Sequence, residues 1–383
     1  MITDYEKLGN GAKRVKMIHT ERLLGALYKD DYSVVELAKI IGVSHPTTKS
    51  IIDQLLSENI VTKSEKTCEK SVGRPHVRYT LNPHHGVFVC INFERYDHSY
   101  YIFDFAMNEL ARRKLKLTNY DLDDIDTIIN DIQTDLKLAG LPLLFVSVAM
   151  VGQVNEKQEV VLSSIFDKHL KHFPFRDYIS EKLHCPVALD NDTRIASIGD
   201  LKEGDLQGLS NLIYMQIGGG ISSVLYNQGE QIVGDYLLPG EVGLTQTDTG
   251  KTLHQECTTR ALIAQLKDRL SEPSTQGLME AIHTDEVVYE TVMKSGVILG
   301  RTLRNMSYLT GIRNIAIVGS IAQMPEDYYR KVKEGADIVY DYHPDAAHIY
   351  DLNIIRSTSL NPVKLGLKYI AKSLYIASLT ASM

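Results

Sequence analysis

The sequence predicts an α/β protein in which a small winged helix-turn-helix head precedes a larger body. Two short helical patterns joined by a glycine turn lie near the N-terminus, and two short β-type runs follow them directly. After residue 83 the pattern changes to apolar β runs that alternate with helical stretches. We therefore expect the head over residues 1–83 and the body over residues 84–383.

Composition narrows the class of protein. With 23% charged and 44% hydrophobic residues in 383, the chain has an ordinary globular profile and enough length for two or three domains. The four cysteines are far apart and form no CxxC pair, which favours a reducing cytoplasm over a disulfide framework. No apolar signal core and no run of about 18 apolar residues occur, so we expect neither secretion nor a membrane span.

Charge is distributed unevenly between the two parts. Residues 1–83 hold 13 Lys and Arg against 10 Asp and Glu, whereas the other 300 residues hold 28 against 38. A mildly basic head on an acidic body indicates that the head is the part that meets a polyanion.

The helices of the head can be delimited by their caps. A first helical pattern covers residues 12–29 and includes Val15 among its apolar positions. Ser33 and Glu36 have the spacing of a capping box that opens a second helix, and Gly42 suits the turn that ends it. Ser44 then reads as the N-cap of a third helix, in whose first turn Pro46 is tolerated.

The third helix has a polar side that is available for DNA. A helix-turn-helix places its second helix in the major groove, where side chains near that helix's N-terminus reach base edges. The alternative is a helical module that docks another protein. For the DNA-binding interpretation the candidate contacts are Ser44, His45, Thr47, Thr48 and Lys49, with Asp53 on the same side.

Two strands over residues 60–64 and 77–81 are predicted to flank a polar wing. Within the wing, Gly73 and Pro75 bracket Arg74 and would fix where this arginine is displayed. A displayed arginine suits a narrow minor groove, where the negative potential is strongest. An ordinary turn with a solvated arginine is an equally good interpretation. Lys63 and Lys70 are candidates for sequence-independent phosphate attraction.

The body is predicted to contain parallel strands with intervening helices. A helical pattern covers residues 125–140. The β runs cover residues 86–91, 100–104, 144–150, 186–189, 212–217 and 314–318.

Four segments of the body resemble landmarks of the ROK family (repressors, open reading frames and sugar kinases). Their order and spacing agree, and the winged head with its Gly-Arg-Pro wing resembles the family's repressor branch, such as the xylose-, glucose- and N-acetylglucosamine-responsive repressors. The resemblance implies a two-lobed, actin-like (ribonuclease H-like) sugar-kinase body. The four segments are Ala149–Val154, Asp190–Arg194, Gly218–Ile221 and Glu241–Leu244.

Departures from the family's kinases lie where ATP would bind. The kinases open the body with Asp-x-Gly-Gly-Thr, but this chain has Asn92-Phe-Glu-Arg-Tyr96, without either glycine. Serines follow the glycines of the 218–220 loop, and Val318-Gly-Ser-Ile321 replaces a triple-glycine turn. Phosphoryl transfer needs positioned donors and a metal, so we expect a body without enzymatic activity.

The family's zinc ligands are also replaced. Members hold zinc with the histidine of Glu-x-Gly-His and three cysteines, whereas this chain has Leu244 at the histidine position and retains one cysteine, Cys257. Because a structural zinc site normally needs four ligands, we expect no metal, and we interpret His254 and Cys257 as surface and packing residues. No cofactor is expected.

A sugar site is the part of the family's machinery that the sequence retains. Asn191 and Asp192 match the pair that binds sugar hydroxyls, and Glu241 matches the residue that reaches the reducing end. An amide beside a carboxylate can donate to and accept from neighbouring hydroxyls. The alternative is a plain turn or helix cap. Arg194 stands where the family has asparagine, which fits a phosphorylated sugar, an acidic sugar or a salt bridge.

Together these observations predict a cytoplasmic transcriptional regulator of carbohydrate-metabolism genes, which we expect to be a repressor. Its partners would be a palindromic double-stranded DNA operator, a sugar or sugar-phosphate effector and a second copy in a homodimer or homotetramer. Two alternatives stay open at this stage. One is an active sugar kinase with a fused head, and the other is a DNA-binding regulator that needs no ligand.

Overall fold

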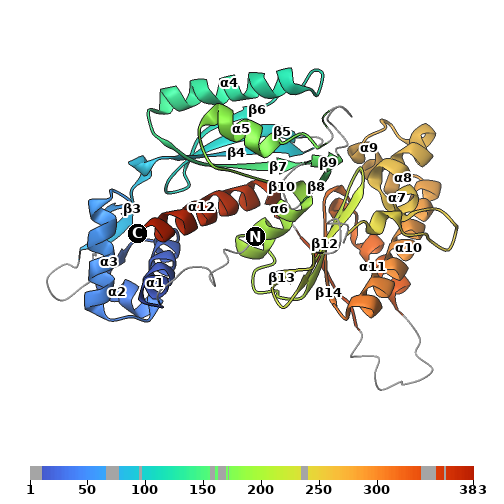
Figure 1. Ribbon diagram of the computed structural model, residues 1–383. Coiled ribbons are helices and arrows are strands. Elements are labelled where there is room, and N and C mark those ends of the chain that lie inside the picture. Colours follow the sequence, from blue (N-terminus) through green and yellow to red (C-terminus); the bar gives the residue numbers. More distant parts are fainter. Residues whose placement is uncertain are drawn as a thin grey trace. The chain divides into compact units, whose positions relative to one another are not determined.

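The computed structural model describes residues 11–65, 77–94, 97–155, 160–162, 170, 172–233, 240–337, 351–357 and 359–383 (Figure 1). The chain divides into two compact units. One comprises residues 1–192 and 366–383, and the other comprises residues 193–365.

The head lies within the first unit and contains the helices α1 (Gly11–Leu27), α2 (Val34–Ile41) and α3 (His45–Ser57). The strands β1 (Tyr32–Ser33), β3 (Arg78–Leu81) and β2 (Val61–Lys63) form one antiparallel sheet in that order. The helices and the two longer strands fall where the sequence predicts them. The two-residue strand β1 was not predicted, because it carries no alternation of its own.

The predicted helix caps of the head are confirmed. The Ser33 side chain accepts a hydrogen bond from the Glu36 amide, and the Ser33 amide donates to the Glu36 carboxylate at 2.7 Å. Gly42 ends α2 in the left-handed conformation, with φ 73°. Ser44 caps α3 by accepting from the Thr47 amide. The amides of Ser33, Glu36 and Thr47 therefore have the partners that the sequence assigns to them.

The expectation that Val15 belongs to the apolar face of α1 is wrong. Its side chain is 50% exposed, whereas Met17, Leu24 and Leu27 are buried. The buried residues recur at helical spacing from Met17, and a position two residues earlier is turned about 200° away from that face.

The sheet of the first unit combines parallel and antiparallel strands in the order β10-β7-β4-β5-β6. Strands β10, β7 and β4 are parallel, but β4–β5 and β5–β6 are antiparallel. The expectation of parallel strands thus holds for half of the sheet. A short connection after β4 can only turn the chain back on itself. The strands are β4 (Val87–Glu94), β5 (Asp97–Asp104), β6 (Glu109–Lys114), β7 (Leu143–Met150) and β10 (Val187–Asn191).

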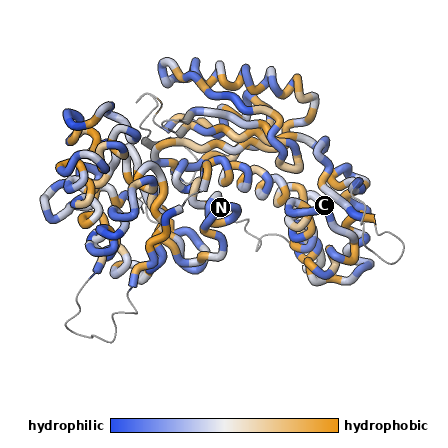
Figure 2. The backbone as a smooth tube through the Cα atoms, turned by 180° about the vertical axis from the view of Figure 1, so that it is seen from behind, coloured by the Kyte–Doolittle hydropathy of each residue, from blue (hydrophilic) through white to orange (hydrophobic). Residues whose placement is uncertain are grey.

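Helices cover both faces of this sheet. On one face lie α4 (Leu122–Ala139) and α5 (Phe175–Leu183), and on the other lies α12 (Pro362–Ser382) (Figure 1). The Ser147 hydroxyl on β7 donates to the Leu367 carbonyl of α12 at 3.0 Å. Burial on both faces explains why the central strands β4 and β7 are mostly apolar, whereas the edge strand β6 is polar and largely exposed (Figure 2).

The second unit has its own sheet in the order β13-β12-β11-β14-β15, with helices packed against it. Its core joins strand residues such as Ile213 and Ile317 to helix residues such as Leu299. The strands are β11 (Leu212–Ile217), β12 (Ile221–Asn227), β13 (Glu230–Gln231), β14 (Asn314–Val318) and β15 (Asn353–Arg356). The helices are α6 (Asp192–Lys202), α7 (Leu253–Cys257), α8 (Thr259–Leu266), α9 (Thr275–Ile282), α10 (Glu286–Thr310) and α11 (Glu326–Ala336).

Within the described residues, no helix is both long enough and apolar enough to cross a membrane.

Candidate functional site

The exposed side of α3 presents polar residues close to the helix N-terminus. Ser44, His45 and Thr47 are exposed, and the hydroxyls of Ser44 and Thr47 lie 2.8 Å apart. Ser50, one turn further along, is also exposed and was not among the predicted contacts. A short polar side chain at such a position gives no sequence signal beyond its place on the helix.

Thr48 does not lie on this exposed side, contrary to our expectation. Its side chain is fully buried, and its hydroxyl donates to the Ser44 carbonyl at 3.0 Å. The back-bond of a threonine to the carbonyl four residues earlier satisfies its hydroxyl inside the head. The methyl group can then pack with Ile51 and Ile52, which are buried on the same helix.

Lys49 is half-exposed and forms an ion pair with Asp53 one turn later. The hydrogen bond to the Asp53 carboxylate raises the pKa of Lys49 above its usual value. An exposed pair of this kind contributes little to stability, so the ammonium group can be transferred to another anion at small cost.

Of the predicted wing residues, only Lys63 lies among the described residues, at the exposed end of β2. Lys70, Gly73 and Arg74 lie outside them. At the base of the wing, Arg78 donates from Nε to the Asp31 carbonyl at 3.0 Å and lies 3.5 Å from the Glu36 carboxylate. Arg78 thereby fixes β3 against the start of α2, a role that its sequence position does not reveal.

Asn191 and Asp192 lie together where β10 ends and α6 begins. The Asn191 side-chain amide donates to the Gly152 carbonyl at 2.7 Å and to the Asp192 carboxylate at 3.1 Å. Asp192 is 8% exposed. Since β10 and β7 are parallel neighbours, with Asn191 opposite Met150, two of the landmark segments meet at one edge of the sheet. The carboxyl ends of parallel strands are where α/β proteins commonly bind ligands.

Glu241 belongs to the second unit and precedes a short 3-10 turn, η5 (Val242–Leu244). Its side chain is partly exposed. The preceding Gly240, at φ 111°, accepts a hydrogen bond through its carbonyl from the Ser223 amide of β12 at 2.9 Å. Leu244, at the position of the family's zinc-ligand histidine, is 62% exposed.

His254, interpreted from the sequence as a surface residue, lies only partly at the surface. Its imidazole is partly buried, and Nδ1 accepts a hydrogen bond from the Ile221 amide at 3.1 Å. Burial lowers the pKa of His254, and Arg260 lowers it further while Glu241 opposes the change. An imidazole that accepts at Nδ1 is neutral there, which agrees with the lowered pKa.

Cys257 is buried in the core of the second unit, as expected of a packing residue. Its thiol donates to the Ser295 carbonyl at 3.3 Å, and burial raises the pKa of the thiol well above its usual value. A thiol held neutral in this way is a poor metal ligand. Among the residues that the structure describes, no three His, Cys, Asp or Glu side chains are grouped as metal ligands would be.

Some backbone groups of the glycine loop of residues 218–220 form hydrogen bonds within the protein. The Gly218 amide donates to the Gly220 carbonyl at 2.9 Å, and the Gly218 carbonyl accepts from the Thr259 amide at 3.0 Å. Three residues after Gly218, the Ile221 amide donates to Nδ1 of His254. The amides of Gly218 and Ile221 therefore already have acceptors within the protein. In the first unit, Asn92 is fully buried within the β4–β5 ladder, opposite Ser99.

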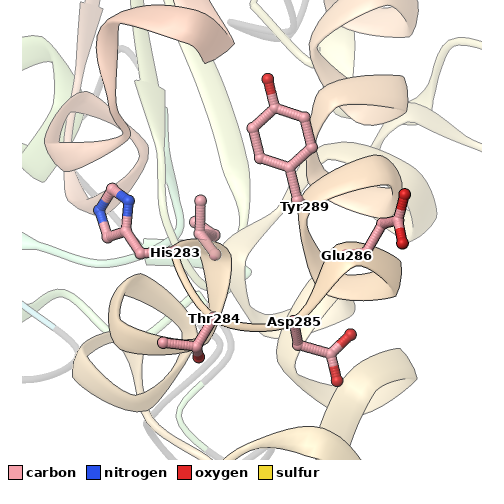
Figure 3. Close-up of a pocket in the computed structure, with 6 residues that line it drawn as sticks. His283, Thr284, Asp285, Glu286 and Tyr289 are labelled. Carbon is pink, nitrogen blue, oxygen red and sulfur yellow. The ribbon is translucent and has the colours of Figure 1, made fainter.

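A surface hollow of about 410 Å³ lies at the turn between α9 and α10. Figure 3 shows that the side chains of this turn project in different directions and do not converge. Asp285 accepts from the Val287 and Val288 amides as the N-cap of α10 and contacts Arg269 at 2.9 Å. We assign these contacts to the helix end and none of them to a ligand site.

Comparison with known proteins gives a family and several relatives. A sequence profile of the ROK family matches residues 89–358. The xylose repressor of Caldicellulosiruptor bescii is 25% identical over 224 residues, covering 56% of this chain and 54% of the repressor. A β-glucoside kinase of Listeria monocytogenes is 24% identical over 194 residues, covering 47% of this chain and 65% of the kinase. The chain thus spans less than two thirds of the length of these curated relatives.

Solved structures resemble the chain at low sequence identity. A ROK family transcriptional regulator, described as a homologue of the Escherichia coli MLC protein, has a TM-score of 0.75 at 18% identity and covers 96% of this chain and 98% of its own. A ROK family glucokinase from Streptomyces griseus, solved with glucose and AMPPNP, has a TM-score of 0.60 at 16% identity. It covers 75% of this chain and 100% of its own.

Proposed function

Because the chain belongs to the ROK family, we propose that it is a DNA-binding transcriptional regulator whose body responds to a sugar or sugar derivative. One observation carries this proposal. The similarity to the ROK regulator extends over 96% of the chain, whereas the glucokinase, matched over its whole length, covers 75%. We infer that the head accounts for much of this difference, because a sugar kinase does not need a DNA-binding part.

In this proposal the head is a winged helix-turn-helix. Helices α2 and α3 are joined by the left-handed turn at Gly42, and β2 and β3 form the antiparallel base of a wing. The exposed N-terminal part of α3 would enter the major groove with Ser44, His45, Thr47 and Lys49. Arg74 would enter the minor groove, with Gly73 shaping the wing, while Lys63 and Lys70 attract phosphates.

The body would act as a sensor rather than a kinase. Asn191 and Asp192 offer an adjacent amide and carboxylate for sugar hydroxyls, and Glu241 supplies a second carboxylate. Two amides of the glycine loop, those of Gly218 and Ile221, already donate within the protein, which supports a body without phosphoryl transfer. Ligand can shift the regulator only if it binds one conformation of the body more tightly than another.

We also propose a homodimer or homotetramer that reads a palindromic operator. A helix-turn-helix protein with two-fold symmetry binds two half-sites that are one helical turn, or a multiple of it, apart. Analytical ultracentrifugation of the full chain with and without operator DNA measures the number of copies directly. A monomer on DNA contradicts this part of the proposal.

The test of the function is fluorescence anisotropy with DNA from upstream of the protein's own gene and its neighbours. The measurement is made at two salt concentrations and repeated with D-xylose, D-glucose and methyl β-D-glucoside. We expect specific, salt-sensitive binding that at least one sugar changes. Specific binding that no sugar changes supports a ligand-independent regulator, and the absence of specific binding contradicts the DNA-binding role.

An active sugar kinase is the second candidate. The similarity to kinases and the retention of Asp192 and the 218–220 glycines favour it. Turnover of ATP with any of the same three sugars supports this candidate. We expect none, because Asn92 and Glu94 replace residues of the first phosphate loop.

A further inference from the structure

Two glycines bracket Glu241 and hold it against neighbouring segments. At Gly240 a Cβ atom would lie 1.8 Å from the Ser223 carbonyl oxygen, so this residue is pressed against the backbone of β12. At Gly243 a Cβ atom would lie 2.3 Å from Nε2 of His254. The backbone on both sides of Glu241 is therefore fixed by close approaches that only glycine permits.

The imidazole of His254 connects this turn to the glycine loop. One edge of the ring occupies the space over Gly243, and Nδ1 at the other edge accepts from the Ile221 amide at 3.1 Å. His254 lies on α7, whose Leu253 amide donates to the Thr245 carbonyl just after η5 at 2.9 Å. One side chain thus touches both the turn that carries Glu241 and the loop that leads into β12.

The glycine loop is held from its other end as well. The Thr258 hydroxyl donates to the His254 carbonyl at 2.9 Å, and the next amide, that of Thr259, donates to the Gly218 carbonyl at 3.0 Å. The segment 254–259 therefore forms hydrogen bonds with the loop at both ends, at Gly218 and at Ile221. All of these contacts lie within the second unit and do not depend on the placement of the first.

We propose that His254 is a positioning residue for Glu241: it ties the 241–244 turn to the 218–221 loop and so sets where the carboxylate meets a sugar. This inference rests on the proposed function, since it assigns Glu241 to sugar binding. His254 itself need not touch the sugar. Without the imidazole, Gly243 loses the ring against which it packs, and the Ile221 amide loses its hydrogen-bond acceptor.

Two substitutions separate the hydrogen bond from the packing. His254→Asn keeps an acceptor oxygen near the place of Nδ1, whereas His254→Leu fills similar space and offers no acceptor. We expect His254→Leu to weaken binding of the responding sugar roughly tenfold, and His254→Asn to restore most of it. Binding is measured by titration calorimetry with D-xylose, D-glucose and methyl β-D-glucoside on the full chain.

A second pair of variants tests the packing against Gly243. Gly243→Ala should weaken sugar binding in the wild-type background, and it should do less harm with His254→Ala, where the ring no longer occupies the space. Gly220→Ala is the matched control, because its Cβ would lie at an ordinary 3.8 Å from Cε1 of His254. Gly220→Ala should keep the wild-type fold by circular dichroism.

A readout without sugar distinguishes this inference from the proposed function. Hydrogen exchange of the Ile221 amide, followed by NMR, should be slow in the wild type and in His254→Asn and fast in His254→Leu. Fast exchange of the wild-type Ile221 amide overturns the inference about His254, and so does an unchanged sugar affinity in His254→Leu. Neither result contradicts the proposed function as a regulator. The protein can also show the expected exchange rates in all three forms and yet bind none of the sugars. That outcome contradicts the sensor function but not the role of His254 in connecting the 241–244 turn to the 218–221 loop.

Discussion

Adjacent residues on α3 have opposite environments, and this determines what each can do. Thr47 is exposed, whereas Thr48 is buried and bonded to the Ser44 carbonyl. We expect Thr47→Ala to weaken operator binding and leave the free energy of unfolding nearly unchanged. Thr48→Val should cost about 1 kcal/mol of stability through the lost hydroxyl and leave operator affinity near wild type. Urea unfolding together with DNA anisotropy checks both, and a reversed pattern contradicts this placement.

Lys63 offers a second test at the residue scale. An exposed lysine at the end of β2 can contact a phosphate without reading sequence. We expect Lys63→Gln to weaken binding to specific and unrelated DNA by a similar factor and to reduce the salt dependence by about one released counterion. Lys294 on α10, far along the chain in the second unit, provides a control substitution that should change neither quantity.

The caps show how much of the head could be predicted from the sequence. A capping box, a C-terminal glycine and a serine N-cap are signals carried by residues within four positions of one another, and the structure places all three as predicted. The face of a helix is decided by its partners instead. For this reason Val15 and Thr48 were assigned to the wrong sides. The helices α10 and α12 and the edge strands β6 and β15 were not predicted either, although Val288, Val292 and Leu299 are buried along α10 at helical spacing.

Substitutions at two glycines of the head can distinguish the effect of helix propensity from the effect of turn geometry. Gly42 ends α2 at φ 73°, while Gly25 lies inside α1, and a Cβ at either would meet nothing within 4 Å. We therefore expect Gly42→Ala to destabilise the head by roughly 1 kcal/mol through backbone strain alone. Gly25→Ala should stabilise it by roughly 0.5–1 kcal/mol, because alanine favours a helix interior. Thermal unfolding checks the opposite signs, and equal shifts in one direction contradict the assigned backbone conformations.

The family of the whole molecule was predictable because its landmarks are spread over the entire body. Four short segments in a fixed order suffice for a resemblance, and the profile match over residues 89–358 confirms it. The contacts that hold the candidate sugar residues were not predictable. Gly152 reaches Asn191 only after β7 and β10 have paired, and His254 reaches Gly243 only once α7 packs beside η5, and no local pattern marks such a partner.

The pH dependence of stability involves one partly buried histidine in each unit, His85 in the first and His254 in the second. Burial lowers the pKa of His85, against the opposing effects of the Asn59 backbone and Glu58, and its Nε2 lies 2.8 Å from the Tyr375 hydroxyl. Burial likewise lowers the pKa of His254. The folded protein therefore takes up a proton on either ring less readily than the unfolded chain, whose imidazoles have the ordinary pKa of 6.5. Their effect on stability is absent well above this pH, and unfolding becomes easier as the pH falls below it.

We expect the free energy of unfolding to be lower at pH 5.5 than at pH 7.5, with a smaller difference in His254→Asn and in His85→Gln, neither of which can take up that proton. Chemical unfolding at the two pH values measures the difference for each variant against the wild type. Since each substitution removes one titrating ring from a different unit, their effects should add. An undiminished pH dependence in both variants would show that other groups, and not these two imidazoles, govern it.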